Sequence, residues 1–201
     1  MDADAVEIRV LGCLVEKQRT TPDVYPLSLN SLRLACNQAT NRDPVVDYDE
    51  RTIRDALERL ARRNWTRLAS GPGSRTAKYR HLLDDALGVV PSELSLLAVL
   101  MLRGPQTPGE LKSRGDRLYP FGSLADVQTA LERLVERELV ARLLRRPGQK
   151  EERYVQLLGG DAGGPVDEPV PAPATARGDL EERVAVLEEQ VAALQRALDP
   201  R

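Results

Sequence analysis

The sequence predicts a mainly α protein with small β-hairpin wings, in which two tandem winged helix-turn-helix domains precede a C-terminal coiled-coil-like helix. The first observation is a duplication, because Ala56-Leu-Glu-Arg-Leu60 is written again as Ala130-Leu-Glu-Arg-Leu134. The second is that each copy is followed by two β-prone runs joined through a Pro-Gly turn, at Pro72-Gly73 and Pro147-Gly148. Two shorter helices, a third helix and a hairpin, in that order, are typical of a winged helix.

The duplication divides the chain into four parts. We expect a first winged-helix domain at 1–88 and a second at 89–158, each close to the lower size limit for independent folding. Residues 159–178 are rich in Gly, Pro and Ala, which favours a flexible linker. A helix with a heptad pattern is predicted at 179–199.

In the first repeat, apolar spacing predicts a helix over about 4–17. Ser28 can cap a second helix that reaches about residue 39, and Asp47 with Glu50 has the spacing of a capping box for the third helix, to about residue 63. The runs 65–69 and 77–83 are the expected wing strands.

The second repeat has the same signals with shorter connections. Ser92 begins a very apolar helix, and Thr107-Pro-Gly-Glu110 has both a capping-box spacing and a proline at the first helical position. Ser123 caps a third helix to about residue 137. The runs 140–144 and 152–157 are the second pair of wing strands.

The C-terminal segment carries apolar residues at alternating spacings of four and three. This arrangement, with valine prominent at one core position and leucine at the other, favours a parallel dimer. The alternative is that the apolar stripe folds back onto its own domains. The predicted self-association positions are Leu180, Val184, Leu187, Val191, Leu194 and Leu198.

Charge and hydropathy exclude some classes of protein. The formal net charge is −2, but residues 1–158 are mildly basic and residues 159–201 are acidic, so the whole-chain charge argues neither for nor against a nucleic-acid partner. The longest apolar run, 94–102, is too short to span a membrane. The acidic start lacks the pattern of a secretory signal, and we therefore expect a cytoplasmic protein without a membrane partner.

Several strings of the sequence have a characteristic composition and order. They are Gly12-Cys-Leu-Val-Glu-Lys17, Thr20-Thr-Pro22, Tyr25-Pro-Leu-Ser-Leu-Asn30, Cys36-Asn-Gln38, Asn41-Arg-Asp-Pro44 and Leu102-Arg-Gly-Pro-Gln-Thr-Pro-Gly-Glu-Leu111. These strings resemble the YceH-like bacterial family of unknown function, and the similarity extends across residues 6–158. The resemblance implies a tandem winged-helix fold and implies no activity.

Enzyme chemistry is not expected. His81 is the single histidine, and the spacing of Cys13 and Cys36 is not that of a metal site, so we predict neither a metal nor another cofactor. No phosphate-binding glycine loop and no nucleophile elbow occurs. The two cysteines fit small core residues, and His81 shares strand parity with Tyr79, which places it on the inner face of the wing.

Binding to duplex DNA is one hypothesis for function. The third helix of the first repeat could enter a groove while the wing contacts phosphate. The stretch 51–81 carries nine arginine and lysine residues against two carboxylates. The candidate nucleic-acid-binding residues are Arg51, Arg54 and Arg62 on the third helix, Arg75, Lys78 and Arg80 on the wing, and Arg42 on the preceding turn.

Other observations favour a protein-interaction scaffold. On the third helix, Arg51 with Asp55, Arg54 with Glu58, Asp55 with Arg59 and Glu58 with Arg62 have the i,i+4 spacing at which a helix neutralises its own charges. The corresponding face of the second repeat is acidic, and its residues are Ala125, Thr129, Glu132 and Glu136. In this alternative the winged helices bind proteins and the tail forms a homodimer; both hypotheses remain open.

Overall fold

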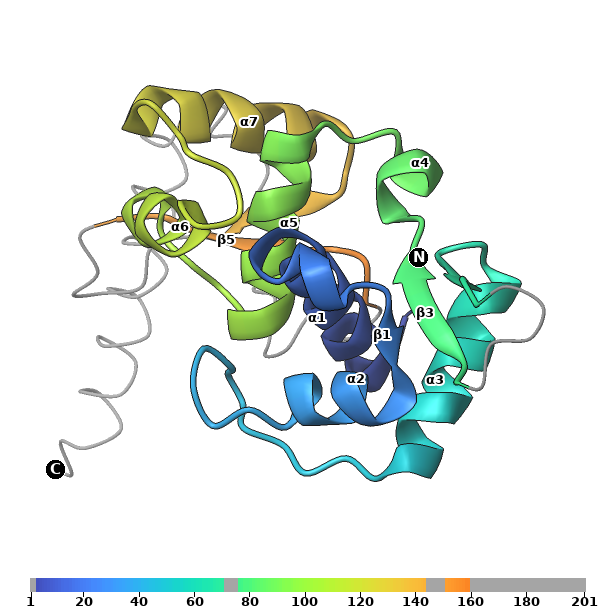
Figure 1. The fold of residues 1–201 in the computed structure, drawn as a ribbon. Helices are drawn as coiled ribbons and strands as arrows, with labels where there is room; N and C mark the ends of the chain where they lie inside the picture. The colour runs from blue at the N-terminus through green and yellow to red at the C-terminus, as the bar shows by residue number, and fades with distance from the viewer. Residues whose placement is uncertain (1–2, 71–75, 144–150, 160–201) are drawn as a thin grey trace, which may run out of the picture. The chain divides into compact units, whose positions relative to one another are not determined.

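In a computed structural model of the chain, the structure describes residues 3–70, 76–143 and 151–159, which all belong to one compact unit (Figure 1). The described residues are mainly helical, with small antiparallel sheets. The elements are α1 (Ala5–Thr20), the 3-10 turn η1 (Pro22–Val24), β1 (Leu27–Ser28), α2 (Leu29–Cys36), α3 (Glu50–Arg62), β2 (Thr66–Leu68), β3 (Lys78–His81), α4 (Leu83–Leu87), α5 (Pro91–Arg103), α6 (Pro108–Gly115), α7 (Leu124–Glu136), β4 (Val140–Leu143) and β5 (Arg153–Gln156).

The order of elements repeats, as the duplicated sequence predicts. Three helices and an antiparallel hairpin occur as α1, α2, α3 and β2–β3, and again as α5, α6, α7 and β4–β5. The short helix α4 joins the two sets and ends at Gly88, whose φ of 60° lies in the left-handed region that glycine adopts without strain.

Three of the predicted helix caps are confirmed. The side-chain oxygens of Ser28, Thr107 and Ser123 each accept a hydrogen bond of 3.2 Å from the backbone N–H three residues later. Each bond satisfies a donor that the first turn of a helix leaves without an intrahelical partner. Pro108 occupies the first helical position of α6, as the sequence predicts.

Two predicted helix starts are wrong by one or two residues. The cap of α3 is Asp49, which accepts from the backbone N–H of Thr52 at 2.7 Å, whereas Asp47 accepts from the side-chain amide of Asn37 at 3.3 Å. Helix α5 begins at Pro91 and not at Ser92. The fixed φ of proline suits the first position of a helix, which explains the earlier start.

The first hairpin gains a third strand. β1 pairs with β3, which gives the order β1-β3-β2, with Leu27 opposite Tyr79. Successive side chains of β3 point to opposite faces of this sheet. His81 is fully buried, with its Nε2 2.6 Å from Oε1 of Gln18 in α1, so its predicted position on the inner face is confirmed.

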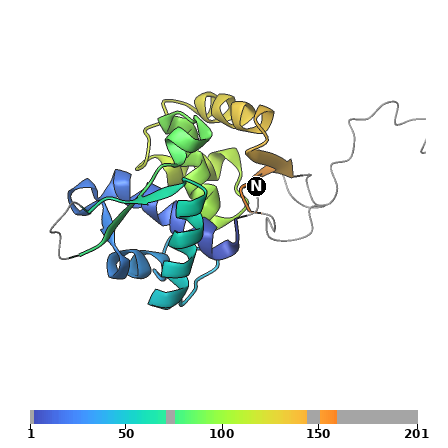
Figure 2. The ribbon, with the colours of Figure 1, turned by 90° about the vertical axis from the view of Figure 1, so that its right-hand side faces the viewer.

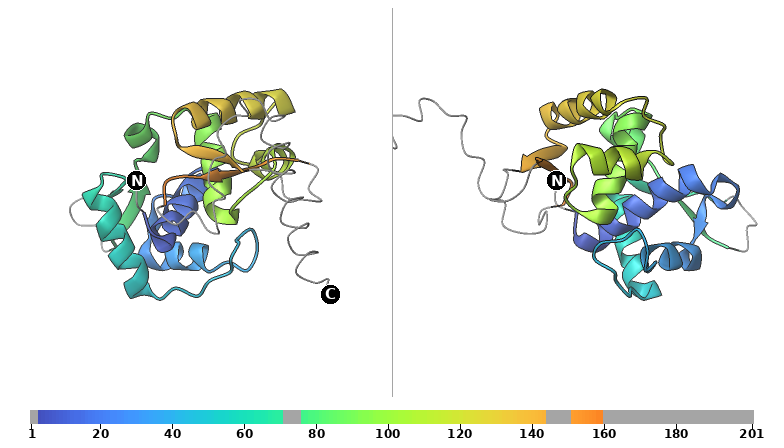
Figure 3. Two further views of the ribbon diagram at one scale, coloured as in Figure 1. Left: turned by 180° about the vertical axis from the view of Figure 1, so that it is seen from behind. Right: turned by 90° about the vertical axis from the view of Figure 1, so that its left-hand side faces the viewer.

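The two repeats share one hydrophobic core. Helix α5 is buried on all its faces because it packs against α1, α6, α7 and β5. Figures 2 and 3 show α1, in blue, crossing α5, in green. The crossing is close at Gly12, where an added Cβ would lie 2.9 Å from the side chain of Leu102. The core therefore forms between the repeats as well as within them.

The N-terminal and C-terminal limits of the described unit also meet. The backbone N–H of Ala3 donates to the carbonyl of Leu158 at 3.1 Å, and Ala3 forms a parallel bridge with Gly159. Within residues 3–70, 76–143 and 151–159, no helix has the length and apolar character needed to cross a membrane. Residues 160–201 lie outside the described part, and with them lie the six predicted self-association positions.

Candidate functional site

Basic side chains occupy one face of the three-stranded sheet. The register places Arg67 of β2 directly opposite Arg80 of β3, and Lys78 precedes Arg80 by two residues on the same face. Like charges in this cross-strand position destabilise a sheet. None of these three residues forms an ion pair with a carboxylate in the described part of the chain. The sheet therefore carries a cationic surface, termed the basic sheet face (Arg67, Lys78 and Arg80), which its own carboxylates do not neutralise.

Helix α3 packs against β2 and adds further basic residues. Its buried face is the predicted one, formed by Ile53, Ala56, Leu57 and Leu60. Arg51, Arg54 and Arg62 are exposed.

The expected neutralisation along α3 is not observed. None of the four i,i+4 pairs lies within 4.0 Å. Instead, Arg59 reaches the start of α1 and pairs with Asp4 at 2.6 Å and Glu7 at 3.7 Å. The three exposed arginines of α3 thus have no ion-pair partner among the described residues, but Asp55 and Glu58 are exposed on the same helix.

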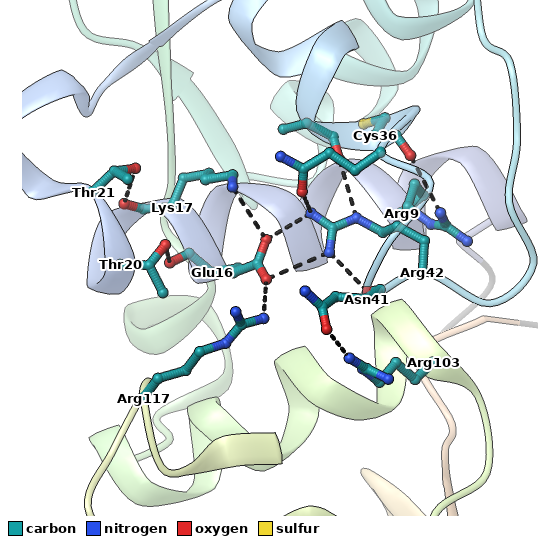
Figure 4. A network of polar contacts seen from close by, with 12 residues as sticks. Arg9, Glu16, Lys17, Thr20, Thr21, Cys36, Asn41, Arg42, Arg103 and Arg117 are labelled. Carbon is teal, nitrogen blue, oxygen red and sulfur yellow. Dashed lines mark hydrogen bonds and ion pairs between the residues drawn. The ribbon is translucent and has the colours of Figure 1, made fainter.

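Arg42 is not placed where DNA could contact it. Its side chain is fully buried, and its Nη2 lies 2.6 Å from Oε2 of Glu16 (Figure 4). The remaining donors are also occupied, since Nε donates to the carbonyl of Ala35 at 3.0 Å and Nη2 also donates to Oε1 of Gln38 at 3.0 Å. Arg42 was predicted as a nucleic-acid-binding residue, but Glu16 holds its guanidinium in the interior. The sequence around Arg42 does not reveal this partner, because Glu16 comes 26 residues earlier in the chain.

The same carboxylate connects the two repeats. Arg117, from the α6–α7 connection, approaches Glu16 to 2.9 Å, and Lys17 approaches it to 3.7 Å (Figure 4). Burial raises the pKa of Glu16, but the hydrogen bond and charge of Arg42, followed by the charges of Lys17 and Arg117, lower that pKa below its usual value. Glu16 is therefore ionised, and the network has a structural role at the contact between the repeats.

The third helix of the second repeat has a different character. Ala125, Thr129, Glu132 and Glu136 are exposed, as predicted. The nearby basic residues point elsewhere, because Arg133 of α7 and Arg137, which directly follows α7, lie 3.8 and 3.6 Å from the buried carboxylate of Glu93. This helix presents no counterpart to the basic surface of the first repeat.

Other candidate chemistry is limited. Among residues 3–70, 76–143 and 151–159, no group of three His, Cys, Asp or Glu residues is arranged to hold a metal ion. Cys13 and Cys36 are both buried, and the hydrogen bond with Cys13, together with burial, raises the pKa of the Cys36 thiol. Burial lowers the pKa of His81 to about 4, so its ring is neutral at pH 7. Arg75 lies outside the described residues.

Comparison with known proteins agrees with the resemblance drawn from the sequence. The profile of the family described as "Protein of unknown function, DUF480" matches residues 3–149. A "UPF0502 protein" of Pelobacter propionicus is 49% identical, over 96% of this chain and 93% of its own length. The "UPF0502 protein YceH" of Salmonella paratyphi A is 45% identical, over 97% of this chain and 94% of its own length. Accordingly, the chain belongs to the family described as "Protein of unknown function, DUF480", and the UPF0502 proteins are its relatives.

Proposed function

We propose that the chain is a duplex-DNA-binding protein built from two tandem winged helix-turn-helix units, and that the first unit makes the DNA contacts. The observation that carries the proposal is the position of Arg67 directly opposite Arg80 on neighbouring strands of the sheet. No carboxylate of the described residues forms an ion pair with either arginine. Such an arrangement costs stability unless an anion lies over it. A phosphate backbone supplies that anion in a winged helix, where the wing contacts the DNA strand.

The proposal gives different roles to the sheet and to the helix. Phosphate contacts are assigned to the basic sheet face, together with Arg75, which lies outside the described residues and follows the predicted Pro72-Gly73 turn in the sequence. Arg51, Arg54 and Arg62 add contacts from α3, which packs against β2. Asp55 and Glu58 lie on the exposed face of α3 and would repel base-edge acceptors in a groove. The contribution assigned to α3 is therefore phosphate affinity from its arginines, which these carboxylates reduce, and not sequence-specific readout.

Fluorescence anisotropy of full-length protein with a mixed-sequence DNA duplex, across a salt series, tests the proposal. Affinity should fall steeply with salt, and each of Arg67→Ala, Lys78→Ala and Arg80→Ala should reduce the slope of log K against log salt by about 0.9. Arg142→Ala is a matched control in the second repeat, because Arg142 is also an exposed strand residue but lies 3.4 Å from Glu152. Its salt slope should equal that of the unaltered protein.

Absence of binding at low salt would contradict the DNA proposal and favour a second candidate, a non-catalytic protein-interaction scaffold. The observation that favours the scaffold is the acidic exposed face of α7. A second test is direct capture of binding proteins with full-length chain and with Glu132→Lys. Partners lost in that variant, alongside an absence of DNA binding, would identify α7 as the interaction surface.

We further propose that the heptad positions at 180–198 form a homodimer. Sedimentation equilibrium of the full-length chain should give twice the monomer mass. Leu187→Asp places a charge at the centre of the heptad seam and should give the monomer mass. A monomer before any substitution would contradict the dimer and would leave the DNA proposal untouched.

A further inference from the structure

A cleft of about 820 Å³ lies between the two repeats. This volume is within the range of small-molecule sites in proteins. The first repeat contributes the start of α1 and the loop between α2 and α3, and the second contributes the end of α5 and the end of β5. The cleft is therefore complete only when both repeats are in place.

Two arginines of the lining have no anionic partner. Arg9 is 4% exposed, and its guanidinium donates to the carbonyl of Cys36 at 3.3 Å (Figure 4). It also donates to the carbonyl of Pro44 at 2.6 Å. Arg103 donates to the neutral side-chain amide of Asn41. Neither guanidinium forms an ion pair with a carboxylate of the described residues. A buried cation that is held only by neutral groups attracts an anion strongly, because the surrounding dielectric is low.

The surroundings of Arg103 strengthen this attraction. Burial lowers the pKa of Arg103, and the positive charges of Arg114, Arg117 and Arg42 lower it further. The carboxylate of Glu16 acts in the opposite direction but is already shared by Arg42, Arg117 and Lys17. The local field near Arg103 therefore remains positive.

Gln156 adds a neutral donor from the second repeat. It is 8% exposed, and its Oε1 accepts from the backbone N–H groups of Leu158 at 2.7 Å and Gly159 at 3.2 Å. These two bonds fix which end of the amide carries oxygen. The NH₂ group has no hydrogen-bond partner among the described residues, while the side chain lines the cleft. Among the described residues, the buried side-chain atoms without a partner are Glu7 Oε1 and Gln106 Oε1, so the NH₂ group of Gln156 is open to solvent in the cleft and is a donor that the acceptor of a ligand can reach.

The rest of the lining determines what kind of anion fits. Ile8, Leu100, Met101 and Val155 supply apolar surface. Asp4, the acidic residue beside them, is occupied by Arg59 at 2.6 Å. Asp43 is exposed to solvent. A bare inorganic ion would leave the apolar surface uncovered, so an anion with an apolar body matches the lining better.

We propose that the cleft binds a small organic anion, such as an aromatic carboxylate, sulfonate or phosphate monoester. The anionic group contacts Arg9, Arg103 and the amide of Gln156, and the apolar body covers Ile8, Leu100, Met101 and Val155. The proposal is independent of DNA binding, since no residue of the basic sheet face lines the cleft.

The test uses the fluorescent anion anilinonaphthalene sulfonate as the probe, titrated against folded full-length protein at neutral pH. Saturable binding at one site is expected. N-phenylnaphthylamine, which has nearly the same apolar body without the sulfonate, should bind at least about 10-fold more weakly, because it leaves the charged donors unpaired.

Two substitutions remove the anion contacts and preserve the local structure. Arg103→Gln and Gln156→Glu should each weaken sulfonate binding by about 10-fold or more, because each removes a donor or adds a repelling charge. Glu at position 156 keeps the acceptors for Leu158 and Gly159. Arg33→Gln is the matched control, because Arg33 is a half-buried arginine that also donates to a side-chain amide, that of Asn30 at 3.2 Å, but does not line the cleft.

Equal affinities for the sulfonate and the neutral probe would overturn the proposal, as would unchanged affinity in both lining variants. Absence of saturable binding would overturn it too. Ala5→Phe provides a check that leaves the charges in place, since it adds an aromatic ring at an exposed position of the lining. This variant should weaken both probes alike, and failure to affect either would place the probe outside the cleft. Unfolding curves of all variants establish that they remain folded.

Discussion

Replacing Glu16 by glutamine should destabilise the protein severely. The substitution keeps the shape of the side chain and removes the negative charge that faces Arg42, whose side chain is fully buried. The guanidinium would then remain in the interior with neutral partners only. Breaking a buried ion pair in this way costs about 3–5 kcal/mol, which is a large part of the ~5–15 kcal/mol that stabilises a typical domain.

Two further variants separate charge from packing. Arg117→Gln removes a cation that is half exposed, at 50%, and should cost less than about 1 kcal/mol. Arg42→Met combined with Glu16→Gln removes both buried charges. Because no unpaired ion is left behind, the double variant should recover most of the stability that Glu16→Gln alone loses.

Urea unfolding at pH 7, with the slope against urea compared between variants, measures these differences. The pH dependence gives a second measurement, because the folded protein lowers the pKa of Glu16 below 4.5. The ion pair therefore contributes fully above that pH and is lost as the pH falls below it, a dependence that Glu16→Gln should lack. A loss for Glu16→Gln no larger than that for Arg117→Gln would refute the reasoning.

Three other predictions concern the buried core. Burial lowers the pKa of His81 from 6.5 to about 4, so the unfolded chain binds a proton at a higher pH than the folded protein does. The free energy of unfolding should therefore fall by up to about 3 kcal/mol as the pH drops from 6.5 to 4. Urea unfolding of a His81→Gln variant should lack this pH-dependent loss. Because Cys13 and Cys36 are buried, both thiols should react with a thiol reagent only at the rate of global unfolding. A fast reaction of either thiol in native buffer would contradict this prediction, because it would show that the thiol is accessible in the folded protein. Gly12→Ala should cost about 1–3 kcal/mol in thermal or urea unfolding, because the new Cβ would approach Leu102 to 2.9 Å, and an unchanged midpoint would mean that the helices separate without cost.

Local signals in the sequence predicted the helices well. Ser28, Thr107 and Ser123 cap helices because a hydroxyl three residues before a free backbone N–H satisfies it whatever the rest of the chain does. The strongly apolar stretch of α5, in which Ser95 is the one polar residue of 94–102, was also informative, since a helix that is apolar on nearly all sides must be covered on every side. The sequence of α5 does not indicate which element covers it, and in the structure one of these elements is α1 of the other repeat.

Long-range pairing explains what the sequence could not predict. The strand β1 has only two residues and exists because β3 offers its free edge. Arg67 was not among the predicted DNA contacts, because its position opposite Arg80 depends on the register between β2 and β3. The burial of Arg42 could not be predicted for a similar reason, since its partner Glu16 is distant in the sequence and no residue near Arg42 indicates the contact.

The contact between α1 and α5 has a consequence for how the protein can be divided. These helices are counterparts, each the first helix of its repeat, and they pack on one another. A single repeat on its own would therefore expose the apolar surface that the other repeat covers. The two halves depend on one another for their core, while their exposed third helices differ, since α3 exposes Arg51, Arg54 and Arg62 and α7 exposes Glu132 and Glu136.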